Sequence, residues 1–198
     1  MAVSVSAILL AAGRSRRMGQ PKQIMSINGK PFISHCLDHI AAAGIGDIVV
    51  VLGAHKREVF QLIAGRPIKV VFNWAPQTEM ADSVRLGLSA VDLGASGVLI
   101  CLSDHPLVAG DTYQRLVDFH RLHPDKIVIP TFRKRRGHPV LFPKALIDQV
   151  FSGFHLRQII DRSTQAVEGL EADDRGILWD IDTPQDYDRA CRSIAKAG

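Results

Sequence analysis

Runs of consecutive apolar residues alternate along the chain with segments whose apolar positions recur every three or four residues. The apolar runs predict buried strands at residues 3–10, 47–52, 68–72, 97–102, 126–129 and 177–181. The helical spacing predicts helices at residues 31–43, 55–64, 80–92, 110–121, 143–151, 155–162 and 184–196. Continuous apolar strands between helices are typical of a sheet that is covered on both faces. We therefore predict an α/β fold with a doubly wound, mostly parallel, Rossmann-like sheet.

The alternation of strands and helices breaks after residue 130. Residues 131–142 predict a small excursion, a hairpin around the basic run at 133–136. Because the chain shows no internal repeat, low-complexity segment or linker, we expect residues 1–198 to form a single domain. In doubly wound sheets, ligands bind beyond the carboxyl ends of the strands. The polar segments that follow residues 10 and 102, together with the segment around residue 181, are therefore expected to converge on one edge.

Composition and charge narrow the class of protein. The 24 Lys and Arg residues exceed the 20 Asp and Glu residues, which gives a formal net charge of +4. This mild excess suits a protein that binds anionic small molecules, and an aromatic content of 6% is low for one that stacks on bases. Cys36, Cys101 and Cys191 are far apart and predict reduced thiols in a cytoplasmic protein. The apolar run at residues 7–12 is too short for a membrane span or a signal, so neither is expected.

The first chemical motif follows the first strand. Its small residues let the backbone pass close to a ligand, so that N–H groups can point at phosphate oxygens. Four positive charges follow within nine residues, at Arg14, Arg16, Arg17 and Lys22. The run matches neither a Walker A loop nor a GxGxxG fingerprint. The alternative is a plain turn with solvated arginines.

This run, Leu-Ala-Ala-Gly-x-Ser-x-Arg-Met-Gly-x-Pro-Lys, resembles the signature of nucleotidyltransferases that move a nucleoside monophosphate from an NTP to a phosphorylated acceptor. The nearest resemblance is to the molybdenum cofactor cytidylyltransferases and their guanylyltransferase relatives, and it extends from residue 5 to about residue 190. It implies that Arg17 and Lys22 hold phosphate charge. The Ala-Ala-Gly form favours the cytidylyl branch. The resemblance also implies that the nucleotide is bound by Leu10, Ala11, Ala12, Gly13, Arg14 and Ser15.

Acidic residues stand where a divalent ion could bind. Asp104, at the end of a predicted strand, matches the metal-binding Asp of an Asp-x-Pro motif in the family, although an Asp before Pro also caps turns. Asp180 and Asp182 point to the same side of a predicted strand. The family has Asp-Ile-Asp-Thr-Pro-x-Asp here, which implies Asp182 as the second metal ligand, with Asp180 as the fallback. The alternative is that Asp182 or Thr183 caps the last helix.

Two weaker motifs complete the resemblance. Gly137, His138 and Pro139 resemble the acceptor-side motif of the cytidylyl branch, which implies contact with a pterin or its phosphate; the alternative is a tight turn. Met80 and Ser83 match a Gly-Met-x-x-Ser-like stretch that holds base and ribose. This chain has Glu79 where Gly is usual, and the alternative for Met80 is a place in the helix core.

Together these motifs predict a Mg²⁺-dependent nucleotidyltransferase, with Mn²⁺ as the alternative metal. Lys22, Arg17 and Asp104 are the expected catalytic residues. The resemblance implies transfer of CMP from CTP to the phosphate of molybdopterin, with release of pyrophosphate and transient contact with a molybdoenzyme. No nucleic acid or membrane partner is expected. The alternatives are guanylyl transfer from GTP, cytidylyl transfer to a sugar phosphate, and a non-catalytic cofactor-delivery protein.

Overall fold

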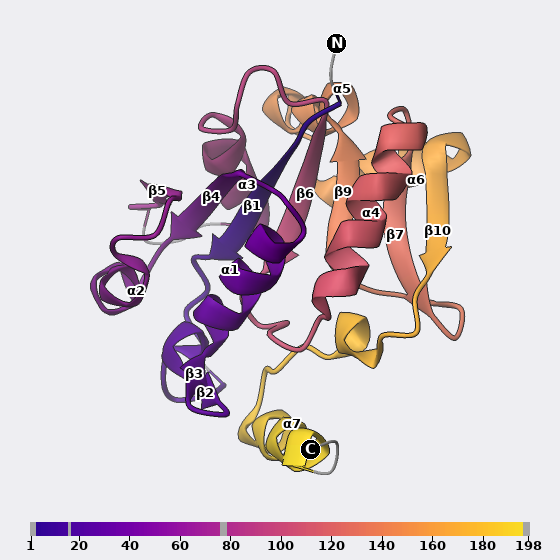
Figure 1. Cartoon of the computed structure of the whole chain (residues 1–198). Coiled ribbons are helices and arrows are strands. Elements are labelled where there is room, and N and C mark those ends of the chain that lie inside the picture. The colour runs from indigo at the N-terminus through magenta and orange to yellow at the C-terminus, as the bar shows by residue number, and fades with distance from the viewer. Residues whose placement is uncertain (1–2, 16, 76–78, 196–198) are drawn as a thin grey trace.

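A mixed sheet forms the centre of the computed structural model, which describes residues 3–15, 17–75 and 79–195 (Figure 1). Its strand order is β10-β7-β9-β6-β1-β4-β5, and β8 pairs with β7. Strand β1 is parallel to β4 and β6, and β4 is parallel to β5. Strand β9 is antiparallel to both β6 and β7, so β7 runs in the same direction as β6. The strands are β1 (Val5–Ala11), β4 (Asp47–Leu52), β5 (Lys69–Phe72), β6 (Gly97–Leu102), β7 (Ile127–Phe132), β8 (Arg135–Arg136), β9 (Val140–Pro143) and β10 (Val167–Glu171).

Helices cover both faces of this sheet, as predicted. Alternate residues of β1 point to opposite faces, because Cβ atoms alternate along a strand. Leu9 packs into one core with α1 (Phe32–Ala42), α2 (Lys56–Ile63) and α4 (Gly110–Leu122). Ile8 packs into the other core with α3 (Met80–Leu88), α5 (Lys144–Ile147) and α6 (Leu156–Arg162). The fold is therefore the doubly wound, mostly parallel α/β class expected from the sequence.

The predicted strand at residues 177–181 is wrong. A 3₁₀ helix, η4 (Arg175–Leu178), ends within this segment, and the Asp174 side chain caps its start by accepting a hydrogen bond from the Gly176 N–H. Ile177 and Ile181 are both fully buried, so the segment is apolar without being a strand. The remaining parallel strand is β10, which pairs with β7 from residue 167 to residue 171.

The last helix, α7 (Pro184–Ala195), lies away from the sheet (Figure 1). It packs on a short hairpin of β2 (Ser26–Ile27) and β3 (Lys30–Pro31), which follows a 3₁₀ turn, η1 (Lys22–Ile24). Tyr187 in α7 donates a hydrogen bond to the Ser26 carbonyl at 2.8 Å. Two further 3₁₀ helices are η2 (Asp148–Ser152) and η3 (Thr164–Ala166). No helix in the described parts of the chain combines the length and apolar character needed to cross a bilayer.

Candidate active site

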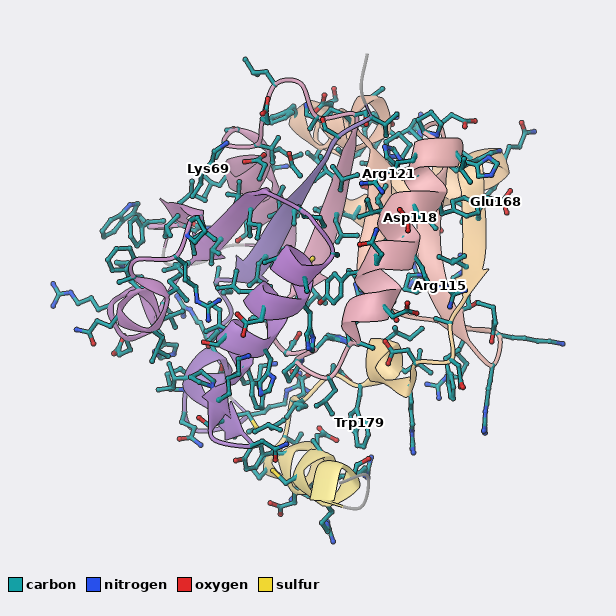
Figure 2. The ribbon with its side chains drawn as sticks, in the orientation of Figure 1. Lys69, Arg115, Asp118, Arg121, Glu168 and Trp179 are labelled. Atoms are coloured by element: carbon teal, nitrogen blue, oxygen red, sulfur yellow. The ribbon has the colours of Figure 1, made fainter. Side chains whose placement is uncertain are left out.

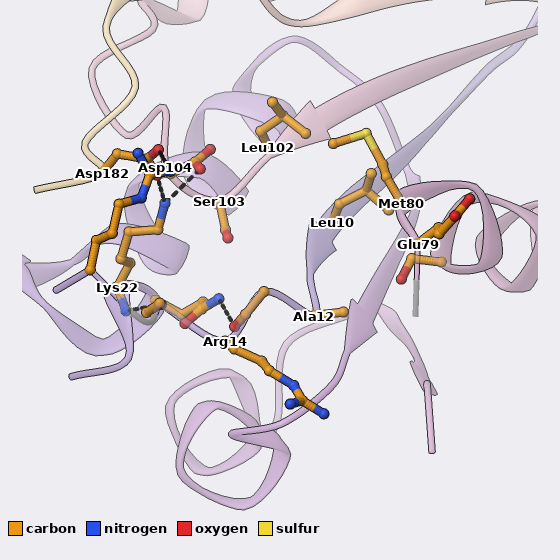
Figure 3. A pocket seen from close by; sticks show the side chains of 15 residues that line it. Leu10, Ala12, Arg14, Lys22, Glu79, Met80, Leu102, Ser103, Asp104 and Asp182 are labelled. Carbon is orange, nitrogen blue, oxygen red and sulfur yellow. Dashed lines mark hydrogen bonds and ion pairs between the residues drawn. The ribbon is translucent and has the colours of Figure 1, made fainter. Parts of the chain in front are cut away.

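A cavity of about 450 Å³ opens where β1 and β6 end at the same edge of the sheet (Figure 3). Segments far apart in sequence meet there, as expected for a sheet of this class. They are the loop after β1 (residues 12–15, called the β1 loop), the start of α3, the end of β6 and the segment before α7. The wall consists of Leu10, Ala12, Gly13, Arg14, Ser15, Arg17, Lys22, Gln23, Glu79, Met80, Ser83, Leu102, Ser103, Asp104 and Asp182.

A lysine held between two carboxylates is the electrostatic centre of the cavity. Lys22 is only 8% exposed, and its Nζ donates to Asp104 Oδ2 at 2.8 Å and to Asp182 Oδ1 at 2.5 Å. The other Asp182 oxygen pairs with the Arg17 guanidinium. Figure 3 shows the Lys22 amine directed at both acidic side chains. Two positive and two negative groups thus form one cluster.

The pKa values of this cluster follow from burial and pairing. Burial alone lowers the pKa of Lys22, but the charges of Asp104 and Asp182 outweigh it and raise that pKa above its usual value. Burial raises the pKa of Asp182, but the Lys22 hydrogen bond and the charges of Lys22 and Arg17 outweigh burial and lower it. Lys22 and Asp182 are therefore both charged at neutral pH.

Hydrogen bonds from Lys22 and Gln23 hold the β1 loop in place. The Gln23 side-chain amide donates to the carbonyls of Ala11 and Gly13, both at 3.3 Å, and the Lys22 N–H donates to Ser15 Oγ at 2.9 Å. Within the described chain, the N–H groups of Gly13 and Arg14 donate to no protein acceptor. These N–H groups are available to a ligand, which agrees with the predicted phosphate contacts.

Gly53, in the loop after β4, packs closely against the backbone of Ala12 in the β1 loop. A Cβ atom on Gly53 would lie 2.5 Å from the Ala12 carbonyl oxygen. No side chain fits between these two backbones. Gly53 therefore sets how far the β1 loop can retreat from the cavity.

The structure distinguishes the two candidate carboxylates near α7. Asp182 lines the cavity, whereas Asp180 is exposed and lies outside the cavity wall. The Ile181 N–H donates to the Asp104 carbonyl at 3.0 Å, which holds this segment beside the end of β6. The helix cap is made by the next residue, since Thr183 and Asp186 exchange hydrogen bonds at the start of α7.

Asp104 has one oxygen that the protein leaves unused. Its Oδ1 is buried and has no hydrogen-bond partner among the described residues, and His105 Nε2 lies 4.0 Å from it. His105, in the loop after β6, is only 6% exposed and packs beside this carboxylate. The pattern Ser-Asp-His-Pro does not indicate this burial.

The predicted acceptor residues Gly137, His138 and Pro139 do not line the cavity. The ring centroids of His138 and His105 are 5.2 Å apart. The motif therefore contacts His105, which in turn lies beside Asp104 of the cavity wall. Burial, with a smaller effect of His105, lowers the pKa of His138 to about 4, so its imidazole is neutral at pH 7. A Cβ on Gly137 would lie 2.4 Å from the Ile177 carbonyl oxygen, which accounts for the glycine.

The start of α3 forms the opposite wall from the lysine. Met80 is 56% exposed and lines the cavity, so its alternative place in the helix core is wrong. Ser83 is buried and accepts a hydrogen bond from the Asn73 amide at 3.1 Å. Residues 76–78 of the same region, and Arg16 in the basic run, lie outside the described residues.

Sequence reasoning missed four residues of the wall, which are Gln23, Glu79, Leu102 and Ser103. Gln23 follows Lys22 directly, and an amide beside a run of cations is a signal for a backbone-pinning role. Glu79 was noted only as a departure from the family, yet it forms part of the wall and of the cap of α3.

A family model described as MobA-like NTP transferase domain matches residues 7–167 of the chain. Purine catabolism protein PucB of Bacillus subtilis (strain 168) is 28% identical over 202 residues, which cover 95% of this chain and 96% of PucB. Nicotine blue oxidoreductase of Paenarthrobacter nicotinovorans is 26% identical over 191 residues, covering 90% and 92%. The bifunctional protein GlmU of Syntrophomonas wolfei is 36% identical over 122 residues, and the match spans only 26% of GlmU.

A solved structure of similar fold is that of Rv0371c from Mycobacterium tuberculosis H37Rv. Its TM-score is 0.87 and its sequence identity 26%, and the match covers 97% of this chain and 99% of that one. A second structure of the same protein, in complex with manganese, has a TM-score of 0.78 at 25% identity and covers 96% and 100%.

Proposed function

Because the chain belongs to the family of MobA-like NTP transferase domains, we propose that it transfers CMP from CTP to the phosphate of molybdopterin and releases pyrophosphate. The observation that carries this proposal is the cluster of Lys22, Asp104 and Asp182 inside a cavity rimmed by the β1 loop. A purely carrying protein has no need of a buried lysine poised between two carboxylates.

The cavity suits a nucleoside triphosphate in size and in charge. Small-molecule sites are commonly about 300–1,000 Å³, and this cavity measures about 450 Å³. The β1 loop offers N–H groups to the phosphates, and Arg14 and Arg17 add positive charge beside them. Met80 and Ser83 form the wall that we assign to the base and the ribose.

The acidic side of the cavity fits a divalent cation. Asp104 has a buried oxygen without a partner, and Asp182 faces the same lysine. The described residues form no group of three or more His, Cys, Asp or Glu side chains able to hold a metal. Mg²⁺ often binds through one or two carboxylates together with substrate phosphates and water, so two are sufficient here. When bound, the ion would polarise the α-phosphate; Mn²⁺ is the alternative, supported by the manganese complex of the mycobacterial relative.

The protein's part in the reaction is alignment and charge. A phosphate acceptor is already an anion near pH 7, so no strong general base is required. Two polyanions must instead be brought together, and positioning with electrostatic stabilisation supplies the rate. Lys22 and Arg17 stabilise the charge that grows on pyrophosphate as it leaves. To do so, the Lys22 amine gives up its hydrogen bond to one carboxylate oxygen and donates to a phosphate oxygen instead.

The reaction implies particular surroundings and a partner. All three cysteines are free thiols, and two of them are buried. Free thiols are consistent with the proposal that the protein functions in the reducing cytoplasm. The product of the reaction is a labile cofactor, so direct transfer to a molybdoenzyme during a transient contact is part of this proposal.

The test is pyrophosphate release by the purified protein with Mg²⁺ and molybdenum cofactor, offered CTP, GTP, ATP or UTP in parallel. Release with CTP supports the proposal, and release with GTP alone identifies the guanylyl branch instead. Silence with all four, despite tight binding of CTP by calorimetry, overturns it in favour of a carrier.

Two matched lysine variants test whether the measured pyrophosphate release depends on this cavity. Lys22→Met should lower kcat by orders of magnitude. Lys30→Met, which removes a lysine paired with Asp38 outside the cavity, should leave turnover near that of the wild type.

A further inference from the structure

A second cavity, of about 480 Å³, lies past the carboxyl end of β7. Its walls come from the turn after β7, from η4 and from α7, and Figure 2 shows the Trp179 side chain between η4 and α7. Four arginines line it, together with the aromatic side chains of Phe132 and Trp179. The arginines are Arg133, Arg135, Arg175 and Arg189.

The wall of this cavity carries positively charged side chains and no negatively charged ones. No Asp or Glu belongs to its wall, and in the described part of the chain none of the four guanidinium groups is within 4.0 Å of a carboxylate. Two of them lie over aromatic rings instead, Arg133 over Phe132 and Arg175 over Trp179, each at 5.1 Å from the ring centroid. All four arginines are exposed, so solvent screens their mutual repulsion, and an anion bound among them would lower it further.

The turn that carries Arg133, one of these four arginines, is strained. Arg133 and Lys134 join β7 to β8, and both adopt positive φ angles, 50° and 65°. Such two-residue turns favour Asn-Gly, because residues with longer side chains are disfavoured in the left-handed region. Glu171 in β10 holds the turn in place by accepting from the Arg133 N–H at 2.9 Å. The chain thus keeps bulky cations at positions that disfavour them, which is typical of a functional site.

The second cavity lies at the same edge of the sheet as the active-site cavity. Strands β6 and β7 run in the same direction, so the carboxyl end of β7 is at the edge where Asp104 follows β6. The segment at residues 179–182 joins the two, because Trp179 lines one cavity and Asp182 lines the other. Three residues of extended chain span about 10 Å at most.

We propose that the arginine-lined cavity binds a planar, negatively charged ring, and that it holds the ring end of the acceptor while the acceptor's phosphate reaches the active-site cavity. The ring is expected to stack on Trp179, and the guanidinium groups to bind its anionic substituents. The volume suits a ring system of about two fused rings with its substituents. The assignment of the ligand to the acceptor rests on the proposed nucleotidyl transfer, whereas binding of a planar anion does not.

Trp179 provides a direct readout of binding. The chain has two tryptophans, so Trp74→Phe leaves Trp179 as the sole indole. In this background we expect pterin-6-carboxylate to quench the tryptophan fluorescence saturably, without CTP or metal. Adding Arg175→Gln and Arg189→Gln should weaken this binding at least tenfold. Arg57→Gln with Arg157→Gln removes the same charge from exposed positions outside the cavity and should leave binding unchanged.

Several results overturn the proposal. They are absence of quenching, equal weakening by the two double variants, and equally strong quenching by inorganic phosphate, which would leave the ring without a role. A separate readout concerns the acceptor: with both Gln substitutions at 175 and 189, its KM should rise at least tenfold while the KM for CTP is unchanged. If quenching persists but the wild type releases no pyrophosphate, the nucleotidyl transfer fails and the anion site stands.

The strained turn gives a second, independent test. Arg133→Asn with Lys134→Gly should raise the thermal unfolding midpoint, because both new residues accept a positive φ, and should weaken pterin-6-carboxylate binding. The rise also shows that the variant is folded. Unchanged affinity in this stabilised variant would contradict a binding role for the turn.

Discussion

Replacing Lys22 by methionine removes the positive charge that separates Asp104 from Asp182. The Lys22 Nζ lies 2.8 Å from one carboxylate oxygen and 2.5 Å from the other, so these oxygens are no more than about 5 Å apart. At an effective dielectric constant of about 20, two unit charges at that distance repel by about 3 kcal/mol. The two side chains are 24% and 23% exposed, and Arg17 still pairs with Asp182. Solvent and Arg17 offset part of the repulsion, so we expect a loss of about 2 kcal/mol in the free energy of unfolding.

Thermal unfolding measures this loss. For a chain of this length, about 2 kcal/mol corresponds to a fall in Tm of roughly 4–8 °C. Combining Lys22→Met with Asp182→Asn should recover most of it, because a single carboxylate remains. Adding Mg²⁺ without nucleotide should raise the Tm of Lys22→Met more than that of the wild type, since the lysine no longer competes for the carboxylate oxygens.

A Tm equal to that of the wild type without metal would refute the electrostatic reasoning. It would mean that solvent screens the two carboxylates fully. An identical response of both proteins to Mg²⁺ would refute the shared use of these oxygens by the lysine and a metal. The Lys30→Met variant serves as control, because Lys30 pairs with a carboxylate on α1 away from the cavity.

Three further variants test other parts of the structure. Thr183→Ala removes the cap shared with Asp186 at the start of α7, and should cost about 1 kcal/mol in urea unfolding. Gly53→Ala places a Cβ 2.5 Å from the Ala12 carbonyl oxygen, so calorimetry should show CTP affinity falling at least tenfold while circular dichroism reports an intact fold. The lowered pKa of His138, about 4 because of burial, means that the unfolded chain takes up its proton first as pH falls. Stability from this group is present above pH 6.5 and is lost between pH 6.5 and 4, by up to about 3 kcal/mol, a loss that should shrink in His138→Asn.

Hydrophobic patterning predicted the central strands of the sheet well, but it failed for the edge strand β10 and for residues 177–181. Strand β1 is buried on both faces, and such strands are apolar throughout, so the pattern identifies them. Strand β10 contains two glutamates, and both are exposed. It forms a strand because its backbone pairs with β7, and this pairing is not visible in the local sequence pattern. The run from Ile177 to Ile181 is apolar for another reason, since its buried residues pack in a non-strand segment.

Motifs predicted that Lys22, Asp104 and Asp182 lie near one another, but the contacts between them were not predictable. The sequence singled out Lys22, Asp104 and Asp182 as charged residues near strand ends. It could not show that one amine joins both carboxylates, because that contact depends on the bond between the Ile181 N–H and the Asp104 carbonyl. The pairing of His105 with His138 depends in the same way on strand β9 lying beside β6.

Asp182 also determines when a growing chain first acquires its full set of charges. Lys22 is made 82 residues before Asp104 and 160 residues before Asp182, so until Asp182 is made Lys22 has at most one of its two carboxylates to pair with. Domains fold largely in the order in which they are made, yet α7 returns to pack on the β2–β3 hairpin near the start of the sequence. Asp182 therefore joins the β1 loop and Lys22 only after the 160 residues that separate it from Lys22 have been made. Until Asp182 has been made, the cavity lacks its second carboxylate, and the cluster of two positive and two negative groups is incomplete.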